Sequence, residues 1–207
     1  RAFAMGTLVS FIFGVGLYGS TYLVPVFLQS ILGYNAATAG LALLPGGIAL
    51  ALMTPGAGYL ADRIRPHRQT ALGLLLFAIS FVLLALLAGI SLGLPLLPTL
   101  MGTVVIGRIG LALILPALNL GSLRPLAQRL VGQGSALLNC TRQLGGTLGI
   151  SLGAVYVEWR SNHLGQPAGS AQAFAEVFAL VALAFFLALG GALAMGKPAT
   201  AATATGR

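Results

Sequence analysis

The sequence predicts an all-α, polytopic membrane protein with six transmembrane helices. Of its 207 residues, 57% are hydrophobic and only 7% are charged, whereas a soluble domain carries about 25% charged residues. No charged residue occurs between Arg1 and Asp62. Because an apolar run of about 20 residues is long enough to cross a bilayer, this stretch alone can supply two membrane spans.

Six apolar segments are each near or above the spanning length of about 20 residues. Together they form one transmembrane domain over residues 1–197, and the composition of residues 198–207 predicts a disordered tail. The six segments are 3–29, 37–60, 70–90, 96–122, 134–157 and 173–195.

The basic residues predict the orientation of these helices. Of the eleven Lys and Arg residues, only Arg160 lies in a connection predicted to face outward. Since positive charge is enriched in cytoplasmic loops, we expect both chain ends and the tail to lie in the cytoplasm. The outward connections are 30–36, 91–95 and 158–172.

The net charge of +8 does not indicate a nucleic-acid partner. The arginines lie mostly at predicted helix ends and in short loops, where they face lipid headgroups and set topology. The single cysteine excludes an internal disulfide and a cysteine-based metal cluster. The sequence has no HExxH helix and no serine-hydrolase elbow, so we expect neither an enzyme nor a metal site.

A charged cluster follows the second predicted helix, which ends in Gly58-Tyr-Leu-Ala and then Asp62. We interpret Asp62 as a clamp in a cytoplasmic gate, where it pairs with Arg63 or Arg65 or meets a helix N-terminus. The alternative is a solvated loop that only sets topology. Arg68 completes the cluster.

Arg108 lies near the middle of the fourth predicted helix, where an arginine costs about 2.5–3.5 kcal/mol on insertion scales. Asn119 lies on nearly the same helical face. Two interpretations stay open. Arg108 is either a gate or substrate-cavity arginine, paired with a carboxylate from elsewhere, or a structural arginine bonded to backbone carbonyls.

The fifth predicted helix carries a polar part followed by a glycine-rich part. Asn139, Arg142 and Gln143 are expected to form a cavity wall on the cytoplasmic side. The glycines that follow are spaced four residues apart, which lets another helix approach closely, and we interpret them as packing residues. They are Gly145, Gly149 and Gly153.

The sequence has only three carboxylates, and none lies in the middle of a predicted helix. Asp62, Glu158 and Glu176 all lie at helix ends. Glu176 is expected near the start of the sixth helix, where the helix dipole stabilises a carboxylate. A proton-titrating role for Glu158 or Glu176 is the alternative.

Several of these stretches resemble a known family. Residues 58–68 resemble the G-x-L-A-D-R-x-G-R-[KR] loop of the major facilitator superfamily, with Arg65 in place of the usual glycine. Residues 139–149 resemble the N-x-x-R-x-L-G-G-x-x-G helix of the EmrB/QacA-type drug:proton antiporters, the fourteen-helix branch. Residues 22–34 and 39–47 are similar to the YLLPLYLQ-x-x-LGY and AGLALLPxG segments of that branch.

The helix around Arg108 is also similar to the R-G-x-G-x-G helix of that branch, although Ile109 replaces its glycine. The resemblance covers residues 1 to about 195. It implies that this chain is the C-terminal six-helix half of an antiporter with a major facilitator fold. The main proton-carrying acid would lie in the missing N-terminal half.

The same resemblance implies the working context. The transporter would be driven by the proton motive force without a cofactor and would export small amphipathic or cationic drug-like compounds across the bacterial cytoplasmic membrane. A periplasmic membrane-fusion protein would be a further partner. The chain begins with Arg1 rather than Met, so we expect a piece of a longer protein. The alternative is a free-standing six-helix membrane protein that works as an oligomeric transporter, a channel-like assembly or an assembly partner.

Overall fold

The computed structural model describes residues 2–89, 96–164 and 167–195. Six long helices and one short 3₁₀ helix account for nearly all of these residues, and the described part contains no strand. The all-α prediction is therefore confirmed. The elements are α1 (Ala2–Ser30), α2 (Ala36–Arg63), α3 (Pro66–Gly89), α4 (Leu96–Leu123), η1 (Gln128–Leu130), α5 (Val131–Leu164) and α6 (Pro167–Ala194).

Five of these helices are long and apolar enough to cross a membrane by length and composition. The exception is α5, which is also the longest helix at 34 residues. Its polar side chains, among them Asn139, Arg142 and Gln143, lower its hydropathy. The helix that is least apolar is thus the one on which the sequence places the candidate cavity wall.

Three predicted boundaries were clearly wrong, and one of them is the start of the sixth helix, which was expected at residue 173 and lies at Pro167. The fifth helix was expected to end at residue 157, but α5 continues to Leu164, so residues 158–164 are helix and not part of an outer loop. The charged residues of that stretch mark the end of the apolar span, and a helix can continue past the membrane into water. Similarly, α3 begins at Pro66 rather than at residue 70, because proline fits the first position of a helix.

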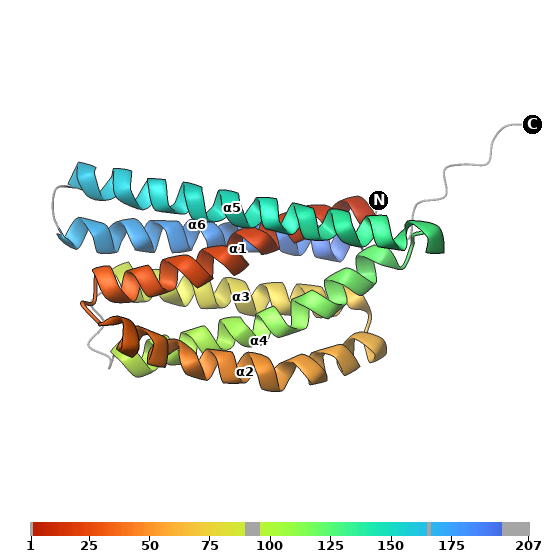
Figure 1. The fold of residues 1–207 in the computed structure, drawn as a ribbon, viewed down its shortest axis with the longest axis horizontal. Coiled ribbons are helices and arrows are strands. Elements are labelled where there is room, and N and C mark those ends of the chain that lie inside the picture. Colours follow the sequence, from red (N-terminus) through yellow and green to blue (C-terminus); the bar gives the residue numbers. More distant parts are fainter. Residues whose placement is uncertain (1, 90–95, 165–166, 196–207) are drawn as a thin grey trace, which may run out of the picture.

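The helices run alternately up and down, so α1 begins and α6 ends at the same end of the bundle (Figure 1). The α2–α3 turn and the α4–α5 connection lie at that end as well. Packing is mirrored between the first three helices and the last three: α1 packs on α5, α4 packs on α2, and α3 packs on α6. This is the arrangement of an inverted repeat of three helices.

Aromatic side chains fill the contact between α3 and α6. Phe77 and Phe185 meet edge to face with ring centroids 4.9 Å apart, and Phe81 and Phe178 are 6.1 Å apart. All four side chains are at most 2% exposed. Edge-to-face and tilted ring pairs at these distances stabilise the contact beyond the effect of burying their apolar area. The contact between α3 and α6 therefore forms a buried aromatic core of the bundle.

Close approach between α1 and α5 depends on glycine. A methyl group on Gly145 would overlap the carbonyl oxygen of Phe11, and one on Gly14 would overlap the carbonyl oxygen of Arg142. Gly149 is less tightly packed, since a methyl group there would lie 2.9 Å from Cα of Val15. Gly153 is less crowded, since its nearest neighbour outside α5 is Leu23. The structure thus places these glycines of α5 against α1 or its neighbours.

We expect Gly145→Ala to lower the free energy of unfolding by about 1–3 kcal/mol, because two backbones would have to separate. Gly47→Ala is the matched control, since a methyl group there meets no atom within 4 Å. Thermal unfolding in detergent measures both. Equal stability of the two variants would contradict this account of the α1–α5 contact.

Candidate functional site

Arg142 is the centre of the candidate site. Its side chain leaves α5 and reaches between α4 and α1, where Nη2 donates a hydrogen bond to Oδ1 of Asn119 at 3.1 Å. The guanidinium lies over the ring of Phe13, 5.7 Å from the centroid. Only 8% of the residue is exposed. The sequence singled out Arg142 and Asn119, but not their contact.

The charge of Arg142 is not neutralised within the described part of the chain. No carboxylate of that part lies within 4.0 Å of it, and its Nε has no hydrogen-bond partner there. Asn119 supplies a neutral oxygen, and Phe13 supplies the electron-rich face of a ring. Because a buried cation is costly without a counter-charge, this site can attract an anionic group.

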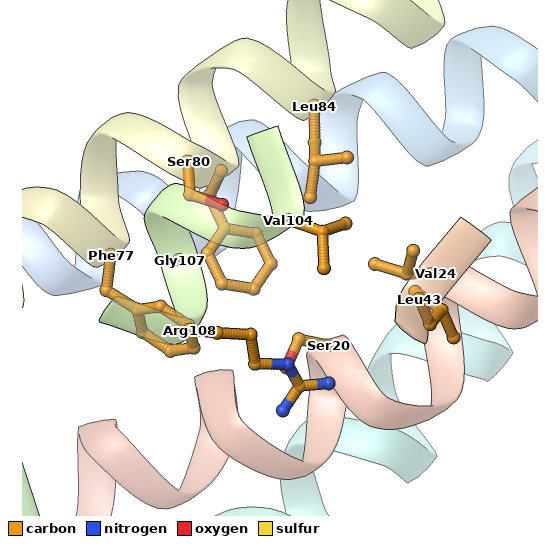
Figure 2. Close-up of a pocket in the computed structure, with 10 residues that line it drawn as sticks. Ser20, Val24, Leu43, Phe77, Ser80, Leu84, Val104, Gly107 and Arg108 are labelled. Carbon is orange, nitrogen blue, oxygen red and sulfur yellow. The ribbon is translucent and has the colours of Figure 1, made fainter. Parts of the chain in front are cut away.

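Arg108 is a second arginine in the middle of a long helix, here α4. It is half-buried on α4, and Figure 2 shows its guanidinium pointing toward Ser20 of α1. Its side chain makes no hydrogen bond or ion pair to a described residue, so neither the carboxylate partner of the first interpretation nor the backbone carbonyls of the second are found there. It borders a cavity of about 20 Å³ lined also by Ser20, Val24, Leu43, Phe77, Ser80, Phe81, Leu84, Val104 and Gly107.

A cavity of that size holds about one water molecule. It cannot hold a drug-sized compound in this conformation. Figure 2 shows that apolar side chains line most of it, with Ser20 and Ser80 as polar partners. Arg108 therefore lies at a small packing gap between helices and not in an open substrate chamber.

The predicted polar stripe of α5 is split over two faces. Arg142 is buried, whereas Asn139 and Gln143 are exposed. Asn139 and Arg142 lie about 60° apart around the helix, so they stand on either side of the boundary between the buried and the exposed surface of α5. Thr147 and Cys140 extend the exposed polar face, which no other described helix covers.

The charged cluster after α2 is open to solvent. Asp62, Arg63, Arg65 and Arg68 are exposed, and Gly58 is half-buried. The ion pair of the clamp hypothesis is not formed in this conformation, since Asp62 pairs with no described cation. Arg63 instead lies over the ring of Tyr59, 4.9 Å from its centroid.

Gln69 is a buried polar residue that the sequence analysis missed. It is 1% exposed on α3, and its Nε2 donates to the carbonyl oxygens of Ala57 on α2 and Leu113 on α4. One side chain thereby ties three helices together near the charged cluster. The only signal in the sequence was a glutamine directly after Arg68, which is equally typical of an exposed loop.

Glu176 belongs to a clamp between α5 and α6. Its carboxylate accepts two hydrogen bonds from Arg160, both at 2.9 Å, and one each from Tyr156 and Gln172. The interpretation that the helix dipole holds Glu176 was wrong, because α6 begins at Pro167 and Glu176 lies in its third turn. A bidentate ion pair fixes both side chains in one geometry. Glu158 is exposed and takes no part in the clamp.

Comparison with known proteins places the chain in a family. The profile described as Major Facilitator Superfamily matches residues 1–150. The chain therefore belongs to the major facilitator superfamily, and it is a multi-pass membrane protein. None of the described residues form a group of three or more His, Cys, Asp or Glu side chains that could hold a metal ion.

Curated relatives are transporters and resistance proteins rather than enzymes. The chain is 30% identical to the Multidrug resistance protein B homolog of Mycobacterium tuberculosis over 164 residues, which cover 79% of the chain and 30% of that protein. It is 30% identical to the Lincomycin resistance protein LmrB of Listeria monocytogenes over 150 residues, covering 72% and 31%. The chain thus spans less than a third of the length of these relatives.

Solved structures agree on the fold. The chain superposes on tetrameric PepTSo2 with a TM-score of 0.79 over 94% of the chain and 40% of that protein, at 16% sequence identity. It also resembles a POT family transporter solved with 5-aminolevulinic acid, with a TM-score of 0.70 and 19% identity. At these identities the likeness shows the fold alone.

We expect Gln69→Leu to lower the free energy of unfolding by about 1–2 kcal/mol, because it removes two hydrogen bonds between helices while keeping the volume similar. Gln133→Leu, at an exposed position of α5, is the control and should change stability little. Chemical or thermal unfolding of both variants in detergent tests this. A neutral Gln69→Leu would mean that the three-helix contact does not stabilise the bundle.

Proposed function

We propose that this chain is the C-terminal six-helix part of a proton-coupled multidrug efflux transporter of the bacterial cytoplasmic membrane. It would work by alternating access, with both ends of the chain in the cytoplasm. Membership of the major facilitator superfamily and the names of the relatives support a transporter. The resemblance of residues 139–149 to the EmrB/QacA-type helix favours the fourteen-helix branch.

The observation that carries this proposal is the position of Arg142. An arginine buried inside a bundle of membrane helices is expensive and is a functional-site candidate by default. Here it contacts α4 through Asn119 and α1 through Phe13. A charge held by three helices is well placed to sense a substrate or a carboxylate and to change the packing of those helices.

The open face of α5 supports a route lined by water or by another part of the transporter. Asn139, Gln143 and Thr147 are exposed along this helix, and an amide side chain left in hydrocarbon without partners is unfavourable. The relatives are about three times as long as the matched region. We therefore propose that the exposed face of α5 faces the N-terminal half of the same polypeptide.

Proton coupling is proposed from the resemblance to drug:proton antiporters, and the charge distribution indicates which half would carry the acid. The chain has three carboxylates, and in the structure Glu176 is paired while Asp62 and Glu158 are exposed. We assign the main proton-carrying acid to the N-terminal half and expect the proton motive force to replace any cofactor. Small amphipathic or cationic compounds are the proposed substrates. A cationic substrate would need that acid to offset the charges of Arg108 and Arg142.

A free-standing six-helix protein remains the second candidate, because two copies could supply both walls of a pathway. The length of the relatives does not favour it. A periplasmic membrane-fusion protein is the proposed additional partner in cells with an outer membrane.

We expect Arg142→Ala to reduce drug export by about tenfold or more in the complete transporter, since it removes an interior charge and its hydrogen bond. Arg142→Lys should recover only part of the activity, because lysine keeps the charge but loses the planar fork. Arg129→Ala, on the exposed α4–α5 connection, is the control. Export is measured in vesicles with an imposed pH gradient, at matched protein levels. Wild-type export by Arg142→Ala would contradict the proposal.

A further inference from the structure

Three arginines from two separate connections face one cavity at an end of the bundle. Arg63 and Arg65 lie at the α2–α3 turn, and Arg124 follows α4. Figure 1 shows both connections at the same end. The cavity has a volume of about 470 Å³ and is lined by Ala61, Asp62, Arg63, Ile64, Arg65, Pro66, Leu120 and Arg124.

The lining carries excess positive charge. Asp62 is the only carboxylate among these residues, so three arginines against one aspartate leave a formal charge of +2. None of the three arginine side chains makes an ion pair with a described residue. Arg63 lies over the ring of Tyr59, and its guanidinium N–H donors have no hydrogen-bond partner among the described residues.

The cavity is also amphipathic. Ala61, Ile64 and Leu120 form its apolar wall beside the arginines. The helices α2 and α4, which end here, are both long and apolar enough to cross a membrane. A cavity at the ends of two such helices is expected where the hydrocarbon of a bilayer meets the headgroups, with its basic residues at the helix ends.

We propose that this cavity binds the phosphodiester headgroup of an anionic bilayer phospholipid. Guanidinium groups bind phosphate oxygens through paired charge-assisted hydrogen bonds, and basic pockets between transmembrane helices are suited to anionic headgroups. The apolar wall receives the first methylenes of the acyl chains, which a free phosphate ion lacks. Arg124 is brought to the site only by the fold.

The experiment measures retention of phosphatidylglycerol by the purified protein with native mass spectrometry. Arg65 and Arg124 supply one lining arginine from each connection. Arg68 and Arg129 supply one exposed arginine from each of the same regions but do not line the cavity. We expect R65Q/R124Q to retain about tenfold less phosphatidylglycerol or worse. R68Q/R129Q, which removes the same charge, should retain it as the wild type does.

Three results would overturn the proposal: an equal loss in both double variants, equal retention of phosphatidylcholine by the wild type, or displacement of the lipid by millimolar inorganic phosphate. The first would mean that only net charge matters, the second that the headgroup charge is irrelevant, and the third that the site takes a soluble anion. If R65Q/R124Q does not fold, the question is decided by R65K/R124K together with the phosphatidylcholine and inorganic phosphate tests on the wild type.

Discussion

The desolvation of the Arg142 guanidinium is the constraint on which the rest of this structure depends. A cation inside a membrane bundle must find polar atoms, electron-rich ring faces or a counter-charge, since hydrocarbon offers none. The described chain gives Arg142 one amide oxygen, from Asn119, and one ring face, from Phe13. Its Nε is left without a partner there. The position of α5 over α1 and α4 is therefore tied to this one side chain, and the unmet donor defines where an anion or a substrate would act.

The glycines of α1 and α5 allow α5 to pack closely enough on α1 for Arg142 to reach its partners. Gly14 lies against the carbonyl of Arg142, and Gly145 against the carbonyl of Phe11, so the two helices approach backbone to backbone. In a membrane, packing of small residues replaces the hydrophobic driving force between helices. The paired phenylalanines of α3 and α6 hold the other side of the bundle, and Gln69 joins α3 to α2 and α4. These contacts join α2, α3, α4 and α6 into one unit beside the close α1–α5 pair.

The sequence was sufficient for what depends on composition and charge spacing: six long helices, their order, and the residues that stand out from them. It was not sufficient for features that depend on the third dimension. Helix α5 continues beyond its apolar residues, so the prediction from hydropathy placed its end too early. Glu176 is paired with Arg160 and does not lie at a helix end. Asn139 and Arg142 look like one stripe by spacing, yet a rotation of about 60° separates a buried cation from an exposed amide. Gln69 gave no periodic signal, and Arg124 joins Arg63 and Arg65 only because two connections fold to the same end.

The most direct test of the central claim uses Cys140, the single cysteine of this chain. It is exposed on α5 beside Asn139, on the polar face next to buried Arg142. In the complete transporter, with all other cysteines replaced, labelling of Cys140 by a membrane-impermeant maleimide reports whether water reaches this face. The account predicts labelling that rises or falls when substrate or a pH gradient is added, because the face opens and closes during transport. A Cys140 that stays unlabelled under every condition would mean that the polar face of α5 does not line the route, and the account would be contradicted.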